Sequence, residues 1–138
     1  MATDPTSTAF ALLYSTLHGD ATLLALLAGG VHQVAAPPGS TPDWLLISQQ
    51  SGTDTNTATA VRILTRMLFQ VKVVGPVQDA GNLRSAYARA DALLQPSGQP
   101  LRNQGGTLAC FREQTISYGE MVEGVLWLHY GGLYRVEV

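Results

Sequence analysis

The stretch between Pro76 and Pro96 constrains the fold most, because its apolar residues recur at helical spacing. They occupy positions i, i+3, i+4, i+7, i+10 and i+11, which is typical of an amphipathic helix that packs one face on another element. Charged side chains such as Arg84 and Arg89 lie off this stripe. The spacing predicts a helix over residues 78–95, docked on a sheet. The stripe consists of Leu83, Ala86, Tyr87, Ala90, Leu93 and Leu94.

A second helical region lies near the N-terminus. The run Asp4-Pro5-Thr6-Ser7 predicts a helix start with Thr6 or Ser7 as the cap, and apolar residues follow at helical spacing. Gly19 interrupts this pattern, and Asp20 is suited to cap a second short segment. We therefore predict a helix over residues 7–28 with a kink or break near Gly19.

The remaining apolar segments alternate with polar residues, as strands do. The last of them contains Gly131-Gly132, which predicts either a bulge or a hairpin turn, and we favour the bulge. A proline-rich loop spans residues 36–42, and the polar segment 51–60 predicts a flexible hairpin loop. The predicted strands are Val31–Ala35, Trp44–Gln50, Val61–Val74, Thr107–Ser117 and Val125–Val138.

This order of elements predicts an α+β fold. A mainly antiparallel β-sheet carries the N-terminal helix and the second amphipathic helix on one face. Leu45 and Ile47 share one face of their strand, and Phe69, Val71 and Val73 share one face of the next. With 138 residues, the chain has room for one domain, spanning 1–138.

The low content of charged residues indicates an unusual protein surface. Charged residues make up 13% of the chain, about half of the roughly 25% that is usual for soluble domains, although the apolar fraction of 46% is normal. Either the surface is rich in Thr, Ser, Gln and Gly, or other subunits cover part of it. We expect both.

The net charge of −2 excludes a cationic nucleic-acid module as the default function class. The charges are segregated along the chain. Residues 1–60 contain four acids and no Lys or Arg, residues 61–112 contain seven bases and two acids, and residues 113–138 contain four acids and one base. Such segments suit head-to-tail association between copies, or else they interleave in the fold and cancel.

Residues with catalytic or metal-binding chemistry are scattered. His18, His32 and His129 have no partner at metal-ligand spacing, and no known catalytic motif is present. The single cysteine, Cys110, excludes an internal disulfide and lies in an apolar run, so we expect it to be buried. The sequence thus predicts no enzyme, cofactor or metal site.

Two pairs of acidic or amide residues are candidates for a functional site. Glu120 and Glu123 are interpreted as solvated turn residues. Asp54 with Asn56 forms an oxygen cluster that lacks the other ligands of a calcium loop.

Three cations, Arg62, Arg66 and Lys72, occupy even spacings on the long strand and are predicted to share one face. Such a face suits phosphates or the acids of a neighbouring copy, and we favour the copy. A DNA-binding accessory protein would also need Arg84 and Arg89 on that face. A small-ligand-binding domain would need a polar pocket, for which the sequence shows no cluster.

No segment reaches the roughly 18 apolar residues that would span a membrane. The N-terminus lacks the positive start of a signal peptide. We expect a soluble protein made in a cytoplasm.

The order of segments resembles the tail completion or tail terminator proteins of long-tailed bacteriophages, prophages and gene transfer agents. The resemblance covers about Phe10 to Val138, and its most specific part is the Pro-Pro-Gly segment followed by Pro, an aromatic residue and an apolar strand. Asp43-Trp44 departs from the usual entry into that strand, and the loop 51–60 lies in a region that varies. The segments that carry it are ALLYSTLHGDATLLALLAGGV, HQVAAPPGSTPDWLLISQQSG, RMLFQVKVVG, DAGNLRSAYARADALL and GGLYRVEV.

The resemblance implies a structural virion protein without catalytic residues. Such proteins form a ring, typically of six copies, on the head-proximal end of the tail tube, stop tube polymerisation and meet the neck proteins. DNA passes through the lumen without specific binding. A head–tail connector facing the portal is the alternative of the same class. Candidates for the subunit or tube interface are Asp54, Asn56, Arg62, Arg66 and Lys72, and the loop 51–60 is expected to order on docking.

Overall fold

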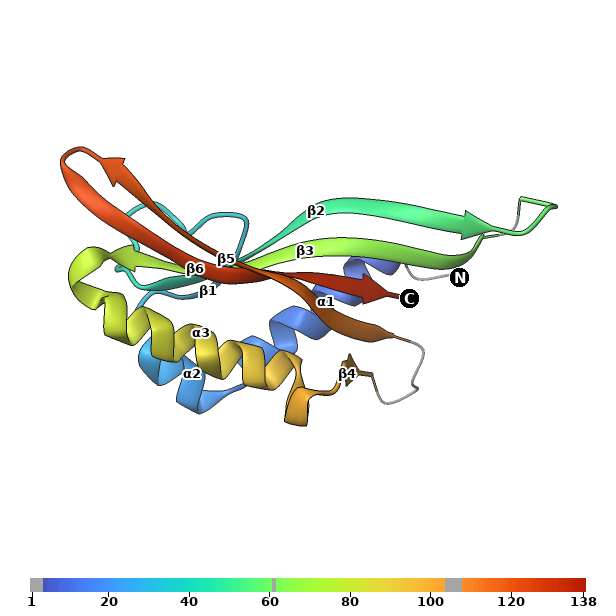
Figure 1. The fold of residues 1–138 in the computed structure, drawn as a ribbon, viewed down its shortest axis with the longest axis horizontal. Helices are drawn as coiled ribbons and strands as arrows, with labels where there is room; N and C mark the ends of the chain where they lie inside the picture. Colours follow the sequence, from blue (N-terminus) through green and yellow to red (C-terminus); the bar gives the residue numbers. More distant parts are fainter. Residues whose placement is uncertain (1–3, 61, 104–107) are drawn as a thin grey trace.

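The computed structural model describes residues 4–60, 62–103 and 108–138. In these residues, six strands form one sheet in the order β1-β2-β3-β6-β5-β4, and the helices lie on one of its faces (Figure 1). The elements are α1 (Pro5–His18), α2 (Ala21–Leu26), β1 (Gly30–Gln33), β2 (Trp44–Asn56), β3 (Arg62–Pro76), the 3₁₀ turn Val77–Asp79, α3 (Ala80–Leu94), the 3₁₀ turn Pro96–Gly98, β4 (Leu101–Arg102), β5 (Ala109–Val122) and β6 (Val125–Glu137).

The α+β prediction is confirmed, and the antiparallel one holds with a single exception among the described strands. β1 pairs with β2 in parallel, and the other described pairs are antiparallel. The parallel pairing arises because segment 34–43 does not turn as a hairpin. It returns the chain from the end of β1 to the level of its start, so β2 runs in the same direction as β1. The sheet is therefore mixed.

The N-terminal helical region divides at Gly19, as predicted. Asp20 caps α2, because its side chain accepts a hydrogen bond from the Leu23 N–H at 2.8 Å. The cap of α1 was predicted wrongly: Asp4, not Thr6 or Ser7, accepts from the Ser7 N–H at 3.1 Å. Pro5 follows at the first helical position, where its missing N–H costs nothing.

Two segments predicted as loop or turn belong to strands. β2 continues to Asn56 and pairs with β3 to its end, with one irregularity between Gln49 and Ser51, so residues 51–56 are strand and the turn begins at residue 57. The reason is that β-branched threonines and cross-strand pairing outweigh a polar composition. Likewise, β5 runs to Val122, so Glu120 is a strand residue and the turn lies at Glu123-Gly124. The predicted start at Thr107 lies outside the described residues.

The predicted bulge at Gly131-Gly132 is also wrong. β6 passes through both glycines in unbroken register with β3, and the irregularity lies in β5, between Arg112 and Gln114. The glycines are needed for close approach, since a Cβ on Gly131 would clash with the carbonyl oxygen of Val71 and a Cβ on Gly132 would clash with the hydroxyl of Tyr87.

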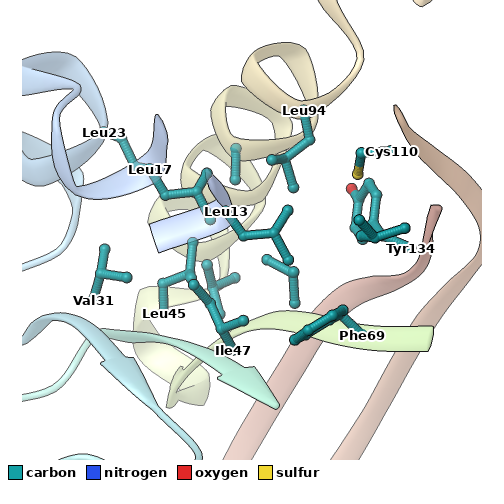
Figure 2. Close-up of a cluster of buried hydrophobic side chains, with 14 of the residues drawn as sticks. Leu13, Leu17, Leu23, Val31, Leu45, Ile47, Phe69, Leu94, Cys110 and Tyr134 are labelled. Atoms are coloured by element: carbon teal, nitrogen blue, oxygen red, sulfur yellow. The ribbon is translucent and has the colours of Figure 1, made fainter. Parts of the chain in front are cut away.

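The core lies between the helices and the covered face of the sheet (Figure 2). α1 contributes Leu13 and Leu17, which meet Leu45 and Ile47 from β2. The predicted shared faces of β2 and β3 are confirmed, as is the helix stripe, with Leu83, Ala86, Ala90 and Leu94 fully buried. Each buried Leu or Ile contributes about 2 kcal/mol of transfer free energy, so this face holds the fold together.

Candidate functional site

The two faces of the sheet differ in what covers them. On the covered face, alternate residues of β2, β3 and β6 pack beneath α1, α2 and α3 (Figure 1). The other face, called here the outer face, carries no helix in the described parts of the chain. Its central positions are nevertheless half-buried apolar residues: Leu46, Leu68, Ile116 and Leu133. Such a face is typical of a surface that another protein covers.

Four aromatic side chains gather on the outer face, here called the outer aromatic cluster: Trp44, Tyr118, Trp127 and His129. The two tryptophan rings stack with centroids 5.6 Å apart, and Tyr118 stacks on His129 at 4.3 Å. A hollow of about 190 Å³ opens between Trp44, Trp127, Val74 and Val122. Large rigid aromatic groups of this kind serve as anchors in protein interfaces.

The surroundings of His129 in this cluster disfavour its charged form. The His129 side chain is 9% exposed, and neither ring nitrogen has a hydrogen-bond partner among the described residues. Burial lowers the pKa of His129, the Lys72 charge lowers it further, and Glu120 partly opposes the shift. Lys72 donates to the Tyr118 hydroxyl at 3.0 Å and lies 5.6 Å from the centre of its ring.

A cleft of about 450 Å³ separates α3 from β5 on the covered side of the sheet. At its floor, the Tyr134 hydroxyl donates to Asp91 at 2.7 Å and contacts the Tyr87 hydroxyl at 3.0 Å. Arg112 completes the network with a 2.8 Å bond to Asp91. Burial raises the pKa of Tyr134, so this hydroxyl stays protonated and acts as a structural donor.

Two long hairpins project from opposite ends of the sheet (Figure 1). The first, called the polar hairpin, comprises the ends of β2 and β3 and carries mainly Ser, Thr, Asp and Asn side chains. The second, called the apolar hairpin, comprises the ends of β5 and β6. It exposes four large apolar side chains, Tyr118, Met121, Val122 and Val125.

A buried carboxyl lies where β2 begins and α3 starts. Asp43 is 4% exposed, and its Oδ2 accepts from the Asn82 amide at 2.7 Å, while its Oδ1 has no partner in the described residues. Burial raises the pKa of Asp43 to about 6, and the charge of Asp79 acts in the same direction. This carboxyl titrates well above its ordinary range.

The structure separates the three cations that were predicted to share a face. Arg66 and Lys72 lie on the outer face, and Arg66 pairs with Glu137 at 3.5 Å. Arg62 lies on the covered side, because the register slips by one residue between Thr55 and Asn56 and reverses the alternation. There Arg62 lines a hollow with Asp4 at the start of α1, and its charge adds to the hydrogen bonds from Ser7 that lower the pKa of Asp4.

Asp54 and Asn56 lie on the polar hairpin together with Arg62. The Asp54 carboxylate accepts from the Thr65 hydroxyl at 2.7 Å across the two strands, so it braces the hairpin. Asn56 is exposed and pairs in register with Arg62. The interface role of these residues stays a prediction.

The alternative of a DNA-binding face loses its geometric basis. Arg84 and Arg89 belong to α3, on the opposite side of the sheet from Arg66 and Lys72. Arg89 is also engaged in a two-pronged ion pair with Asp20, at 2.9 and 2.8 Å. That pair lowers the pKa of Asp20 to about 2. The segregated charges of the sequence thus interleave in part.

The other candidate residues have structural surroundings. His18 stacks on Tyr14, and His32 contacts the Gly29 carbonyl. Burial raises the pKa of the Cys110 thiol to about 12, so it is not a nucleophile at neutral pH. No group of three His, Cys, Asp or Glu side chains that would hold a metal occurs in the described residues. Nor is any helix within those residues both long and apolar enough to cross a membrane.

Sequence reasoning missed the surfaces that are most distinctive. The outer aromatic cluster joins Trp44 to Trp127, which are far apart in the chain, and only the strand order brings them together. The exposed Met121 and Val122 had a signal: they continue the alternation beyond residue 117, next to a Glu-Gly turn.

The fold is similar to that of known structures over nearly its whole length. A chain in the virion of a native gene transfer agent particle matches with a TM-score of 0.60 and 17% identity, covering 91% of this chain and 92% of that one. A second solved structure, whose name describes no function, matches with a TM-score of 0.58 and 22% identity, covering 99% and 96%. No protein-family model and no curated protein matches the sequence. This α+β fold is therefore one that a gene transfer agent virion also contains.

Proposed function

We propose that this chain is a structural protein of a phage-like virion, and specifically a tail terminator or tail completion protein. It forms a ring on the head-proximal end of the tail tube, stops tube polymerisation and joins the tail to the neck. The observation that carries the proposal is the similarity of fold, over 91% of the chain, to a chain of a gene transfer agent virion. It acts in the virion, as one domain over residues 1–138, after assembly in the bacterial cytoplasm.

The outer face supports an assembly function. A sheet face with half-buried leucines and stacked tryptophans, in a chain with 13% charged residues, has more apolar surface than a solitary monomer needs. Obligate subunit interfaces have this character, resembling a domain core cut in half. The partners are further copies of the chain, the tail tube protein and the neck proteins.

The polar hairpin is the proposed contact with the tail tube. Asp54, Asn56 and Arg62 lie at its end, and Arg66 and Lys72 follow on the outer face of β3. Polar surfaces of this kind suit contacts made late in assembly, because they stay hydrated until docking. DNA passes through the ring lumen without specific binding, in keeping with the net charge of −2.

The proposal is tested by letting purified tail tube protein polymerise with and without this chain. A terminator shortens the tubes in proportion to its concentration, and electron microscopy shows it at one tube end. If tube length does not change and the chain instead binds portal or neck proteins, it is a head–tail connector. If it binds neither tube nor neck proteins, the proposed function is wrong.

A further inference from the structure

The end of the apolar hairpin has no role in the fold just described. Met121 is 66% exposed, Val122 42% and Val125 43%. The two acids Glu120 and Glu123 flank Met121 and Val122 in the sequence and are exposed as well. A hairpin end with three exposed apolar side chains is a costly surface to leave in water, and isolated strand ends are normally protected by charge or proline.

The cleft between α3 and β5 offers the complementary chemistry. It is lined by the aromatic groups Tyr87 and Tyr130, by Ala88, and by the cations Arg84 and Arg112. Arg112 is paired with Asp91, whereas Arg84 makes no ion pair within the described residues and lies 5.5 Å from the centre of the Tyr130 ring. The cleft therefore has one uncompensated positive charge beside an apolar wall.

The hairpin end and the cleft match in size and charge. A volume of about 450 Å³ accommodates a few side chains, and it lies in the range of about 300–1,000 Å³ typical of binding sites. Glu123 of the hairpin end would meet Arg84, and Met121 would fill the apolar part beside Tyr87.

The hairpin end and one wall of the cleft are formed by the same strand, β5, so they cannot meet within one chain. β5 lines the cleft at Ile116, and Glu123 lies seven residues further along the chain, which corresponds to about 23 Å in an extended strand. The hairpin end also points away from the helices (Figure 1). The occupant of the cleft is therefore a second copy.

We propose that the apolar hairpin of one copy inserts into the α3–β5 cleft of the next, with Met121 as the apolar anchor and Glu123 facing Arg84. The contact joins different surfaces of the two copies, so it repeats head to tail and closes into a ring where the rotation permits. This inference rests on the proposed function, since it names the surfaces through which the ring forms.

The test is a pair of charge reversals, Glu123→Arg and Arg84→Glu, with Arg102→Glu as the matched control. Arg102 is likewise exposed but lies in β4, away from both surfaces. Sedimentation measures association, and thermal unfolding checks that each variant folds. Each single reversal is expected to weaken association at least tenfold, and Arg102→Glu is expected to leave it unchanged.

Mixing the two single variants gives the decisive result. At one contact in the mixture, the introduced arginine of the Glu123→Arg variant meets the introduced glutamate of the Arg84→Glu variant. At the next contact the native pair of Glu123 and Arg84 meets, so alternating copies restore every interface. We expect association within threefold of the original protein. Equal association of all variants, or no recovery on mixing, would overturn the inference.

The two proposals fail in distinguishable ways. Rings that form on tubes but ignore both reversals would contradict the cleft contact and leave the terminator function standing. Reversals that weaken tube binding without changing self-association would assign the cleft to the tube protein and overturn the self-docking proposal. A chain that neither self-associates nor binds tubes would contradict both proposals.

Discussion

The two hairpins have the same architecture and opposite surfaces. Both are long antiparallel pairs that extend beyond the helices, one at each end of the sheet (Figure 1). The polar hairpin braces itself with the Asp54–Thr65 hydrogen bond and presents Thr and Asn side chains. The apolar hairpin exposes Met121, Val122 and Val125. The contrast is what the two proposals use: they assign the contacts between copies to the apolar hairpin and the contact with the tail tube to the polar hairpin.

The largest effect on self-association is expected when acids are placed on the apolar hairpin, and the same change on the polar hairpin serves as its control. The double variant Met121→Asp with Val125→Asp should weaken self-association by about 100-fold or more, because interface anchors contribute about 2 kcal/mol each. The matched variant Thr53→Asp with Thr55→Asp should leave self-association unchanged. Light scattering over a dilution series measures both variants. The reverse pattern would exchange the roles assigned to the hairpins.

The second prediction concerns two buried titratable groups, Asp43 and His129, which both lie at the end of the sheet where β2 begins and β3 ends. The pKa of Asp43, before β2, is raised to about 6, so the folded state binds its proton more readily and this group favours folding as pH falls from 6 to 4. The lowered pKa of His129, in β6, acts in the opposite direction, so its contribution to stability is lost as pH falls below about 6.5.

Denaturant unfolding from pH 8 to pH 4 separates the two groups. Asp43→Asn should raise the free energy of unfolding at pH 8 by about 2 kcal/mol and leave a protein that loses stability on acidification. His129→Gln should instead leave one that gains stability as pH falls from 7 to 5. The same pH profile in both variants would show that these assignments are wrong.

The third prediction compares the hydrogen bonds that support the hairpins. Tyr134→Phe removes the buried donor to Asp91 and the partner of Tyr87, and should cost about 1–2 kcal/mol of unfolding free energy. Thr65→Val removes the donor to Asp54, whose carboxylate is exposed and can be hydrated, so the cost should be about 0.5 kcal/mol. Urea titrations give both values, and equal costs would contradict the difference in burial.

Effects smaller than that of Tyr134→Phe are expected at the two turns. Ala60 has a φ of 63° in the turn of the polar hairpin, so Ala60→Gly should stabilise the fold by about 0.5–1 kcal/mol. Gly124 has a φ of 79° in the other turn, so Gly124→Ala should destabilise it by about 1 kcal/mol. Thermal unfolding measures both changes, and shifts of the same sign would contradict these turn conformations.

Local sequence patterns predicted the helices and most strands. The length of β2 and the order and direction of the strands depend on long-range pairing, which local patterns do not show. The stripe from Leu83 to Leu94 and the break at Gly19 were visible because helical periodicity and capping are local. The extent of β2 through Asn56 was not, because polar residues remain in a strand when a partner strand supplies their hydrogen bonds. The parallel pairing of β1 depends on a crossover that no spacing encodes.

The candidate surfaces were less predictable than the elements. Even spacing placed Arg62 with Arg66 and Lys72, and a single register slip moved it to the other side of the sheet. The outer aromatic cluster depends on β6 lying beside β3, which only the folded topology shows. The low charge of the chain predicted only that the surface is rich in Thr, Ser, Gln and Gly or is partly covered by other subunits, because composition averages over all such details.

The central claim, that this chain is an assembling virion protein, is tested most directly by its mass in solution, measured by light scattering with and without tail tube protein. The account predicts a ring of about six copies, either in the free protein or once tube protein is present. A monomer whose mass stays unchanged at high concentration and in the presence of tubes would contradict it.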